Sequence, residues 1–339
     1  MRLQTQFELK KQEADSIFNA FKGLKALIIG DVMLDSYMWG KVNRISPEAP
    51  VPVVSVNRKE NRLGGAANVA LNIQALGATP VLCAAVGDDR EGDLFLELLK
   101  KQKLSTAGIL KSKKRITTVK TRVIGNNHQL LRVDEEIESD LNASESGDLL
   151  KLLSEILKKE KIDVIIFEDY DKGLLTADLI KKVVDLAASK KIPTVVDPKK
   201  KNFFNYFGVT LFKPNLKEFK EGSKIDFDHT DAKELKQSSD DFRKRQNISS
   251  LLITMSEQGI FVNDKTTSKI IPAHVRSIAD VSGAGDTVVS VAALCLALKL
   301  SSTLIASIAN LAGGLVCEKV GVVPIDKEQL YKEVLSIDL

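Results

Sequence analysis

The segment Asp280-Val281-Ser282-Gly283-Ala284-Gly285-Asp286-Thr287 places a carboxylate among small residues, directly before an apolar stretch. Gly283, Ala284 and Gly285 would leave backbone N–H groups accessible at a helix start, where the positive end of the helix dipole also lies. Such a cradle suits a phosphate group. At its edge, Asp286 could accept a proton from an alcohol that attacks the bound phosphate. We therefore treat Asp286 as the candidate catalytic base.

Other known phosphate motifs do not fit this segment. A P-loop needs Gly-Lys followed by Ser or Thr, and the segment contains no lysine. A dinucleotide fingerprint needs a third glycine at the position of Val288. A plain glycine turn with Asp286 as the helix N-cap remains the alternative, and the segment alone does not separate it from an anion site.

Two further motifs lie near the N-terminus. Gly64 and Gly65 open a helical stretch in which Asn68 could donate and accept hydrogen bonds to a hydroxylated ligand. Asp35 follows the first apolar run, where a carboxylate suits two hydrogen bonds to sugar hydroxyls. The plainer alternatives are a helix packed tightly through its small residues and, for Asp35, a solvated turn.

Asn215 and Glu218 stand three residues apart after Lys213-Pro214. On a helical turn they would share a face, and their oxygen atoms could hold a hydrated magnesium ion. An N-capped surface helix is the alternative.

Short apolar runs alternate with helical patterns along almost the whole chain. The runs have the length of strands covered on both faces: Ala26–Gly30, Val81–Gly87, Val164–Phe167, Thr194–Val196 and Leu251–Thr254. The helical patterns are Ala66–Leu76, Leu94–Gln102, Leu149–Lys159, Leu179–Ser189 and Thr287–Leu298. The alternation predicts one α/β domain with a doubly wound sheet, whose ligands bind beyond the carboxyl ends of the strands.

Two β-rich segments interrupt this alternation, at about residues 36–56 and 113–135. The second contains the turn signal Gly125-Asn126-Asn127. Together they predict a small β-sheet that projects from the main body as a lid. The polar segment Lys220–Asn247 is predicted to be helical.

Composition narrows the class of protein. With 339 residues, 28% charged and 44% hydrophobic, the chain is globular rather than disordered or collagen-like. The net charge of +4 gives no reason to expect nucleic acid or membrane partners. Cys83, Cys295 and Cys317 lie apart among apolar neighbours, which indicates buried thiols in a reducing compartment.

Two further observations indicate the cellular compartment of the protein. No apolar run approaches the roughly 20 residues of a membrane span, and Met1–Lys11 lacks the apolar core of a secretory signal. We expect a soluble, cytoplasmic protein. The three histidines lie far apart, so no histidine-based metal site is expected.

Taken in order, the glycine pair with Asn68, the Asn215-x-x-Glu218 motif and the Asp280–Asp286 segment resemble the PfkB (ribokinase-like) carbohydrate kinases over essentially the whole chain. A closer resemblance is to the members of this family that phosphorylate D-glycero-β-D-manno-heptose 7-phosphate, the kinase half of bifunctional ADP-heptose synthases. It is carried by Gly30–Asp35, Arg44–Val53, Gly64–Ala70, Asp169–Gly173, Asp197–Lys199 and Ser256–Gly259. The resemblance implies a single ribokinase-like domain over 1–339, a three-layer doubly wound sheet with a small lid, and no nucleotidyltransferase domain.

The resemblance also implies roles for individual residues. Asp286 would be the catalytic base, with Gly283, Ala284 and Gly285 as the anion hole. Sugar hydroxyls would be bound by Asp35, Gly64, Gly65 and Asn68, and nucleotide by Asp197, Lys199, Thr254, Gly259 and Asn310. Arg44, Asp169 and Lys172 are further candidate substrate-binding residues. Asn215 and Glu218 would position Mg²⁺ through water, and Asp280 with Ser282 would form a K⁺ loop.

The implied reaction is ATP-dependent phosphorylation of C1 of the heptose 7-phosphate to the 1,7-bisphosphate, a precursor of ADP-heptose and the lipopolysaccharide core. Because a phosphorylated sugar needs a distant cationic clamp, Arg44, Lys172 and Arg132 are the candidates for it. A ribokinase- or fructokinase-like kinase and a non-catalytic sensor of sugar or nucleotide are the alternatives. Exposed apolar residues of the lid, including Trp39 and Val51–Val56, suggest a homodimer formed through this sheet, as in relatives.

Overall fold

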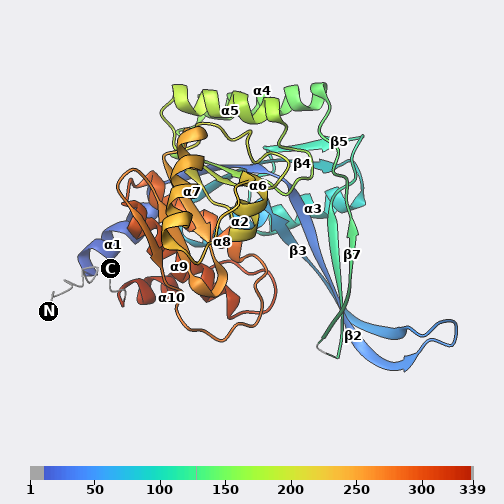
Figure 1. The fold of residues 1–339 in the computed structure, drawn as a ribbon. Coiled ribbons are helices and arrows are strands. Elements are labelled where there is room, and N and C mark those ends of the chain that lie inside the picture. The colour runs from blue at the N-terminus through green and yellow to red at the C-terminus, as the bar shows by residue number, and fades with distance from the viewer. Residues whose placement is uncertain (1–10, 127, 337–339) are drawn as a thin grey trace.

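The computed structural model describes residues 11–126 and 128–336, so Asn127 of the predicted turn and most of Met1–Lys11 lie outside the described residues. Within them, a nine-stranded sheet crosses the molecule in the order β13-β12-β11-β10-β9-β8-β1-β4-β5 (Figure 1). Its strands are β1 (Lys25–Gly30), β4 (Thr79–Gly87), β5 (Ile109–Ser112), β8 (Val164–Glu168), β9 (Thr194–Asp197), β10 (Leu211–Phe212), β11 (Ser250–Thr254), β12 (Ile260–Asn263) and β13 (Ser268–Ile271). All pairs are parallel except β11–β12 and β12–β13.

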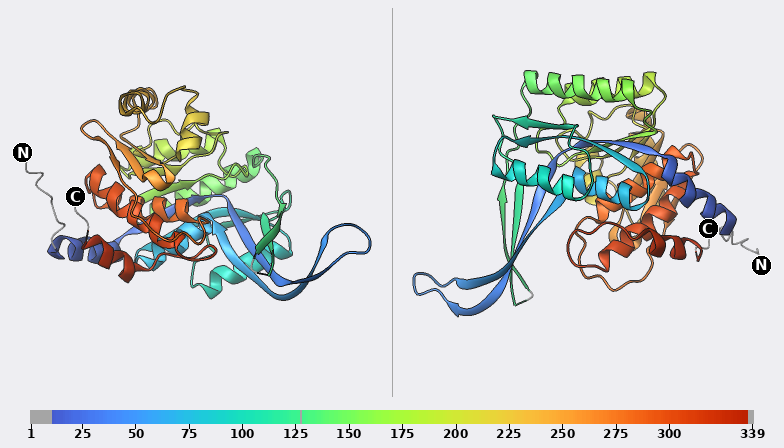
Figure 2. Two further views of the ribbon diagram at one scale, coloured as in Figure 1. Left: turned by 60° about the horizontal axis from the view of Figure 1, so that its bottom comes forward. Right: turned by 180° about the vertical axis from the view of Figure 1, so that it is seen from behind.

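Helices cover both faces of this sheet and make three layers (Figures 1 and 2). One face carries α1 (Lys11–Ala20), α2 (Ala66–Ala75), α3 (Arg90–Lys101), α8 (Ala284–Ala297), α9 (Ser302–Cys317) and α10 (Lys327–Val334). The other carries α4 (Ala143–Lys159), α5 (Ala177–Ser189), α6 (Leu216–Ser223) and α7 (Ala232–Arg245). Short 3₁₀ turns occupy Phe21–Gly23 and Ser256–Gln258.

The continuous apolar runs follow from this layering. In β1, Ala26 and Ile28 pack into the core shared with α2 and α8, whereas Leu27 and Ile29 pack into the core shared with α4 and α5. Since successive side chains of a strand point to opposite faces, a strand between two helix layers must be apolar at every position. The structure confirms the five predicted strands, which correspond to β1, β4, β8, β9 and β11.

A second, four-stranded sheet has the order β3-β2-β6-β7 and projects from the main body (Figure 2). It contains β2 (Val32–Ile45), β3 (Pro52–Gly65), β6 (Val119–Gly125) and β7 (His128–Glu135). The first predicted range, 36–56, is too short at both ends, because β2 and β3 together span 32–65. The second, 113–135, begins six residues before β6. The first range was underestimated because β2 follows β1 after a single residue and β3 continues directly into α2, so no turn marks either boundary. We call this four-stranded unit the small sheet.

Some expectations need correction, and others hold. The polar segment Lys220–Asn247 spans the end of α6 and all of α7 rather than one helix. The three cysteines are buried and free, as predicted. Among the residues that the structure describes, no helix is both long enough and apolar enough to span a membrane.

Candidate active site

Asp286 lies in the first turn of α8 and is buried, with 4% of its surface exposed. Each carboxylate oxygen accepts one hydrogen bond: Oδ2 from Nδ2 of Asn68 at 2.7 Å, and Oδ1 from the hydroxyl of Tyr170 at 2.7 Å. Gly283 occupies the N-cap position of α8. The alternative in which Asp286 caps the helix is therefore wrong, and its carboxylate serves another purpose.

The surroundings of Asp286 shift its proton affinity. Burial raises the pKa of the Asp286 carboxyl above its usual range, and the hydrogen bonds from Asn68 and Tyr170 oppose this shift. The carboxylates of Asp197 and Asp35 raise it further. A buried carboxylate with a raised pKa is a stronger proton acceptor than an exposed one, which suits general base catalysis.

A close contact and a positive φ require glycine at position 283, whereas position 285 leaves room for a Cβ at ordinary van der Waals distance. Gly283 has φ of 80°, and a Cβ there would lie 2.9 Å from Nδ2 of Asn68. A Cβ on Gly285 would lie 3.4 Å from Oδ2 of Asp197. The N–H of Ala284 makes a long bond of 3.3 Å to a carbonyl three residues earlier. These residues bring the positive end of the α8 dipole to the wall of a cavity.

Three adjacent parallel strands deliver charged side chains to this point. Glu168 ends β8 and Asp197 ends β9, and the strand register pairs the two residues. Lys213 follows β10, and its Nζ lies 2.8 Å from Oδ2 of Asp197, with 2% and 8% of the two side chains exposed. Burial raises the pKa of Glu168 well above its usual range, and the charges of Asp197 and Asp286 add to the shift.

Sequence reasoning missed Tyr170, Glu168 and Lys213 as members of this site. Glu168 and Tyr170 follow the apolar run of β8, and Lys213 follows that of β10. Ligand sites in such sheets lie beyond strand ends, so a systematic inspection of those positions could have found them.

A cavity of about 710 Å³ opens beside the N-terminus of α8, within the roughly 300–1,000 Å³ range of small-molecule sites. The structure brings all five predicted nucleotide-binding residues to its wall, namely Asp197, Lys199, Thr254, Gly259 and Asn310. The same wall includes Tyr170, Lys213, Gly283, Ala284, Gly285 and Asp286. A single cavity therefore joins the predicted nucleotide residues to the predicted base.

Asn215 and Glu218 form a capping box at the start of α6. Oδ1 of Asn215 accepts from the Glu218 N–H, and the Asn215 N–H donates to Oε2 of Glu218, both at 2.8 Å. The other carboxylate oxygen of Glu218 accepts a hydrogen bond from the ammonium of Lys199. The N-capped helix is thus present, and both side chains also line the cavity.

The predicted sugar-binding residues gather where β2, β3 and α2 meet. Asp35 is buried and pairs with Arg122 of β6. A Cβ on Gly64 would lie 2.2 Å from Oδ2 of Asp35, so only glycine fits beside this carboxylate. Gly65 has φ of 61° and precedes α2. Oδ1 of Asn68 is buried without a hydrogen-bond partner, although Nδ2 of the same amide contacts Asp286.

The structure separates other predicted substrate residues from this site. Arg44 is exposed near the outer end of β2, on the arm that projects from the body (Figure 1). Asp169 is buried and accepts hydrogen bonds from Tyr206 at 2.6 Å and Asn202 at 3.1 Å. It does not line the cavity. Arg44 lies near the far end of the 14-residue strand β2, on the projecting arm. Asp169 is held in the interior by its hydrogen bonds with Tyr206 and Asn202.

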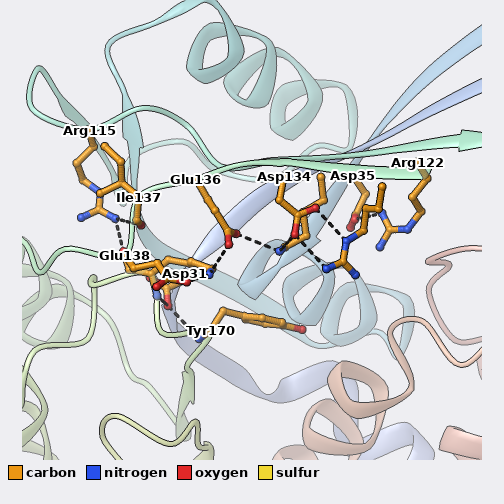
Figure 3. Close-up of polar contacts among 12 residues, drawn as sticks. Asp31, Asp35, Arg115, Arg122, Asp134, Glu136, Ile137, Glu138 and Tyr170 are labelled. Atoms are coloured by element: carbon orange, nitrogen blue, oxygen red, sulfur yellow. Dashed lines mark hydrogen bonds and ion pairs between the residues drawn. The ribbon is translucent and has the colours of Figure 1, made fainter. Parts of the chain in front are cut away.

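The other two phosphate-clamp candidates, Lys172 and Arg132, are paired with acidic side chains, of which Asp134, Glu136 and Glu138 are labelled in Figure 3. Nζ of Lys172 lies 2.8 Å from carboxylate oxygens of both Glu136 and Glu138. Arg132 pairs with Asp134 at 2.9 Å. A cation with one or two carboxylate partners is a weak candidate for holding a sugar phosphate, so we do not retain Lys172 or Arg132 in that role.

Asp280 and Ser282 lie in the loop before α8. The Asp280 carboxylate accepts hydrogen bonds from the N–H of Ser282 and from the N–H of Gly321, both at 2.9 Å. The predicted K⁺ loop is thus joined to the segment that follows α9. Among residues 11–126 and 128–336, no group of three or more His, Cys, Asp or Glu side chains forms a metal centre.

Comparison with known proteins places the chain in a family. The model of the pfkB family carbohydrate kinases matches residues 24–328. The chain is 36% identical to a bifunctional protein HldE of Syntrophotalea carbinolica over 96% of its length, and 40% identical to that of Helicobacter pylori strain HPAG1 over 88%. It spans 66% and 63% of these two relatives, slightly less than two thirds of their length.

Solved structures agree on the fold. Phosphofructokinase-2 from Escherichia coli in complex with potassium superposes with a TM-score of 0.76 at 17% identity, covering 92% of this chain and 99% of that one. The expected ribokinase-like architecture, with a large sheet and a second small one, is confirmed. The chain belongs to the pfkB family of carbohydrate kinases, which are phosphotransferases that act on a sugar hydroxyl.

Proposed function

We propose that this sugar kinase uses ATP and Mg²⁺ to phosphorylate the C1 hydroxyl of D-glycero-D-manno-heptose 7-phosphate, giving the 1,7-bisphosphate. The observation that supports the reaction most directly is the buried Asp286, which opens on the same cavity as the N-terminus of α8. The choice of heptose rests on the resemblance in segments such as Arg44–Val53, and on 36–40% identity to proteins named bifunctional protein HldE. The product would supply ADP-heptose for the lipopolysaccharide core.

In the proposed reaction, Asp286 accepts the proton of the C1 hydroxyl as the C1 oxygen bonds to the γ-phosphorus. The bond from that phosphorus to the βγ-bridging oxygen breaks, and ADP leaves. The N–H groups of Gly283, Ala284 and Gly285, with the α8 dipole, stabilise the negative charge that develops on the transferred group. Asp35, Gly64, Gly65 and Asn68 hold the sugar, and the free Oδ1 of Asn68 is available to one of its hydroxyls.

The cavity residues suit a magnesium nucleotide. Lys199 and Lys213 supply positive charge beside the phosphate path, while Thr254, Gly259 and Asn310 line the remainder of the cavity. Bound Mg²⁺ would neutralise phosphate charge. Asn215 and Glu218 already hydrogen-bond to each other in the capping box. They would therefore hold Mg²⁺ through water molecules, while phosphate oxygens of the nucleotide would bind it directly, as is common for Mg²⁺.

Turnover of a sugar panel tests the proposal. ADP release is measured with heptose 7-phosphate, ribose, fructose and fructose 6-phosphate, and we expect the highest kcat/KM for the heptose. Asp286→Asn should lower kcat by about 10²–10⁴-fold. Asp163→Asn is the matched control, because Asp163 is a largely buried aspartate at the opposite end of the sheet that accepts from the Lys25 N–H.

Each outcome of this panel has a clear meaning. Faster turnover of ribose or fructose would reject the heptose assignment and favour a ribokinase- or fructokinase-like activity. Binding of sugar or nucleotide without ADP release would favour a sensor of the same fold. Undiminished turnover by Asp286→Asn would remove Asp286 from the role of base.

Two finer elements complete the proposal. We expect a homodimer through the small sheet, where Ile45, Val51, Val56 and Leu131 expose 43–60% of their surface. We also expect K⁺ to bind near Asp280 and Ser282, as a structural neighbour is described in complex with potassium. Light scattering tests the first, and turnover in K⁺ against Na⁺ buffers tests the second.

A further inference from the structure

Tyr170 contacts the proposed base, a role that the sequence analysis did not assign to it although it lies in the segment Asp169–Gly173. Its hydroxyl donates to Oδ1 of Asp286 at 2.7 Å, while Asn68 serves the other oxygen. Burial raises the pKa of the Tyr170 phenol well above its usual range, and the charge of Asp286 adds to this shift. The phenol therefore stays protonated and can act only as a donor toward the carboxylate.

The backbone around Tyr170 is fixed by a buried carboxylate. Asp31, at the end of β1, accepts hydrogen bonds from the N–H groups of Tyr170 at 2.9 Å, Lys172 at 3.1 Å and Leu174 at 3.2 Å. Three donors to one carboxylate define the path of this loop closely. We call residues 169–174 the tyrosine loop.

The tyrosine loop is also tied to the segment that leaves the small sheet (Figure 3). The Lys172 ammonium bridges Glu136 and Glu138, which follow β7, and Glu136 pairs in turn with Lys120 of β6 at 3.0 Å. From the other side, Arg115 donates to the carbonyl of Lys172 and to that of Ser139. Contacts from the small sheet therefore reach the loop that carries Tyr170.

We propose that Tyr170 is a positioning residue for Asp286, and that Lys172 acts through it by holding the tyrosine loop against the segment after β7. The inference rests on the proposed role of Asp286 as base. Tyr170 directs one carboxylate oxygen and favours its ionised form, because a hydrogen bond to a buried charge offsets part of the cost of burial.

Several other charged groups face Asp286, and they must stay unchanged in any test. Asp35 from β2, Asp197 from β9 and Glu168 from β8 are close enough to interact with Asp286, and Lys213 after β10 and Lys199 after β9 act on Glu168 beside it. Tyr170→Phe leaves all five in place and removes one hydroxyl. Its effect can therefore be attributed to the lost hydrogen bond.

The titration of Asp286 in the free protein is the primary test. Aspartate labelled with ¹³C at Cγ is followed by NMR against pH, and the Asp286 signal is assigned by its absence in Asp286→Asn. In Tyr170→Phe the midpoint should rise by about one pH unit, the worth of a hydrogen bond to a charged group. Tyr331→Phe is the matched control, since it removes a similarly short hydroxyl–carboxylate bond, to Asp15 at 2.6 Å, outside the tyrosine loop, and should leave the midpoint in place.

Lys172 is tested in the same way. Lys172→Met should move the Asp286 midpoint in the same direction, and the double variant Lys172→Met/Tyr170→Phe should move it no further than Tyr170→Phe alone. If Lys172→Met fails to fold, Glu138→Gln weakens the same anchor at a largely exposed residue. Additive shifts, or no shift with Lys172→Met or Glu138→Gln, would overturn the part assigned to Lys172.

Activity provides a second readout once a substrate is known. The acid limb of the kcat/KM profile should move to higher pH in Tyr170→Phe, whereas a purely structural loss would lower kcat without moving the limb. An unchanged midpoint in the NMR titration would refute the inference even if Asp286→Asn is inactive. Full activity of Asp286→Asn would instead refute the proposed function, and the titration would still report whether Tyr170 tunes Asp286.

Discussion

Replacing Lys213 with methionine should destabilise the fold strongly. Its Nζ lies 2.8 Å from Oδ2 of Asp197, and both side chains are almost fully buried. At an effective dielectric constant of about 20, this contact corresponds to a gross attraction of about 6 kcal/mol, which the desolvation of both charges largely offsets. Removing only the cation strands the Asp197 carboxylate, so we expect the free energy of unfolding to fall by about 3–5 kcal/mol.

The loss should depend on pH. Burial raises the pKa of Glu168 well above its usual range and the charge of Lys213 opposes this shift, so in Lys213→Met the folded protein holds the Glu168 proton more tightly than the parent protein does. The stability of the variant therefore falls more steeply than that of the parent protein as pH rises. The difference from the parent protein should therefore be largest near about pH 8 and smaller near about pH 5.

Urea unfolding followed by far-UV circular dichroism measures the effect at both pH values. Lys217→Met is the control, because Lys217 is an exposed lysine whose partner Glu221 lies one helical turn away. Asp197→Asn combined with Lys213→Met should recover part of the stability, since no charge is then stranded. A loss below about 1 kcal/mol near pH 8, or no recovery in the double variant, would refute the account of the buried pair.

Two further predictions concern Asp31 and Gly283. Burial, together with the charge of Asp169, raises the pKa of Asp31 from 3.8 to about 6 against its N–H donors, so the folded state holds this proton more tightly than the unfolded chain. Stability should therefore fall as pH rises from about 4 to 6, by up to about 3 kcal/mol, and Asp31→Asn should remove that fall in urea titrations; an unchanged slope would assign it to another acid. Gly283→Ala should cost about 1–3 kcal/mol, because φ is 80° and the new Cβ would lie 2.9 Å from Nδ2 of Asn68; wild-type stability would contradict this.

Much of the fold was predictable because it depends on local patterns. A strand covered by helices on both faces must be apolar throughout, which made runs such as Ala26–Gly30 and Val164–Phe167 recognisable. Elements without such a pattern were missed. The two-residue strand β10 and the hairpin of β12 and β13 depend on neighbours in the sheet rather than on their own composition.

The candidate site divides in the same way. Asp286 and the glycines at the start of α8 stand in one contiguous segment, so an anion site beside a candidate base could be predicted from the sequence. Arg44 and Lys172 were selected for their charge alone. Pairing in the small sheet carries Arg44 outward, and Lys172 is neutralised by two glutamates that are about 35 residues distant in sequence.

Residue types and their spacing were enough to identify the kinase family and the candidate base, because the carboxylate of Asp286 stands beside glycines at a helix start in one contiguous segment. Which groups surround that carboxylate required the folded molecule. Asn68 and Tyr170 lie 218 and 116 residues from Asp286. Tyr170 meets it because β8 ends at the edge of the sheet where the site lies, and Asn68 because α2 packs against α8. Proton affinity depends on distance and burial, and neither is written in the order of the residues.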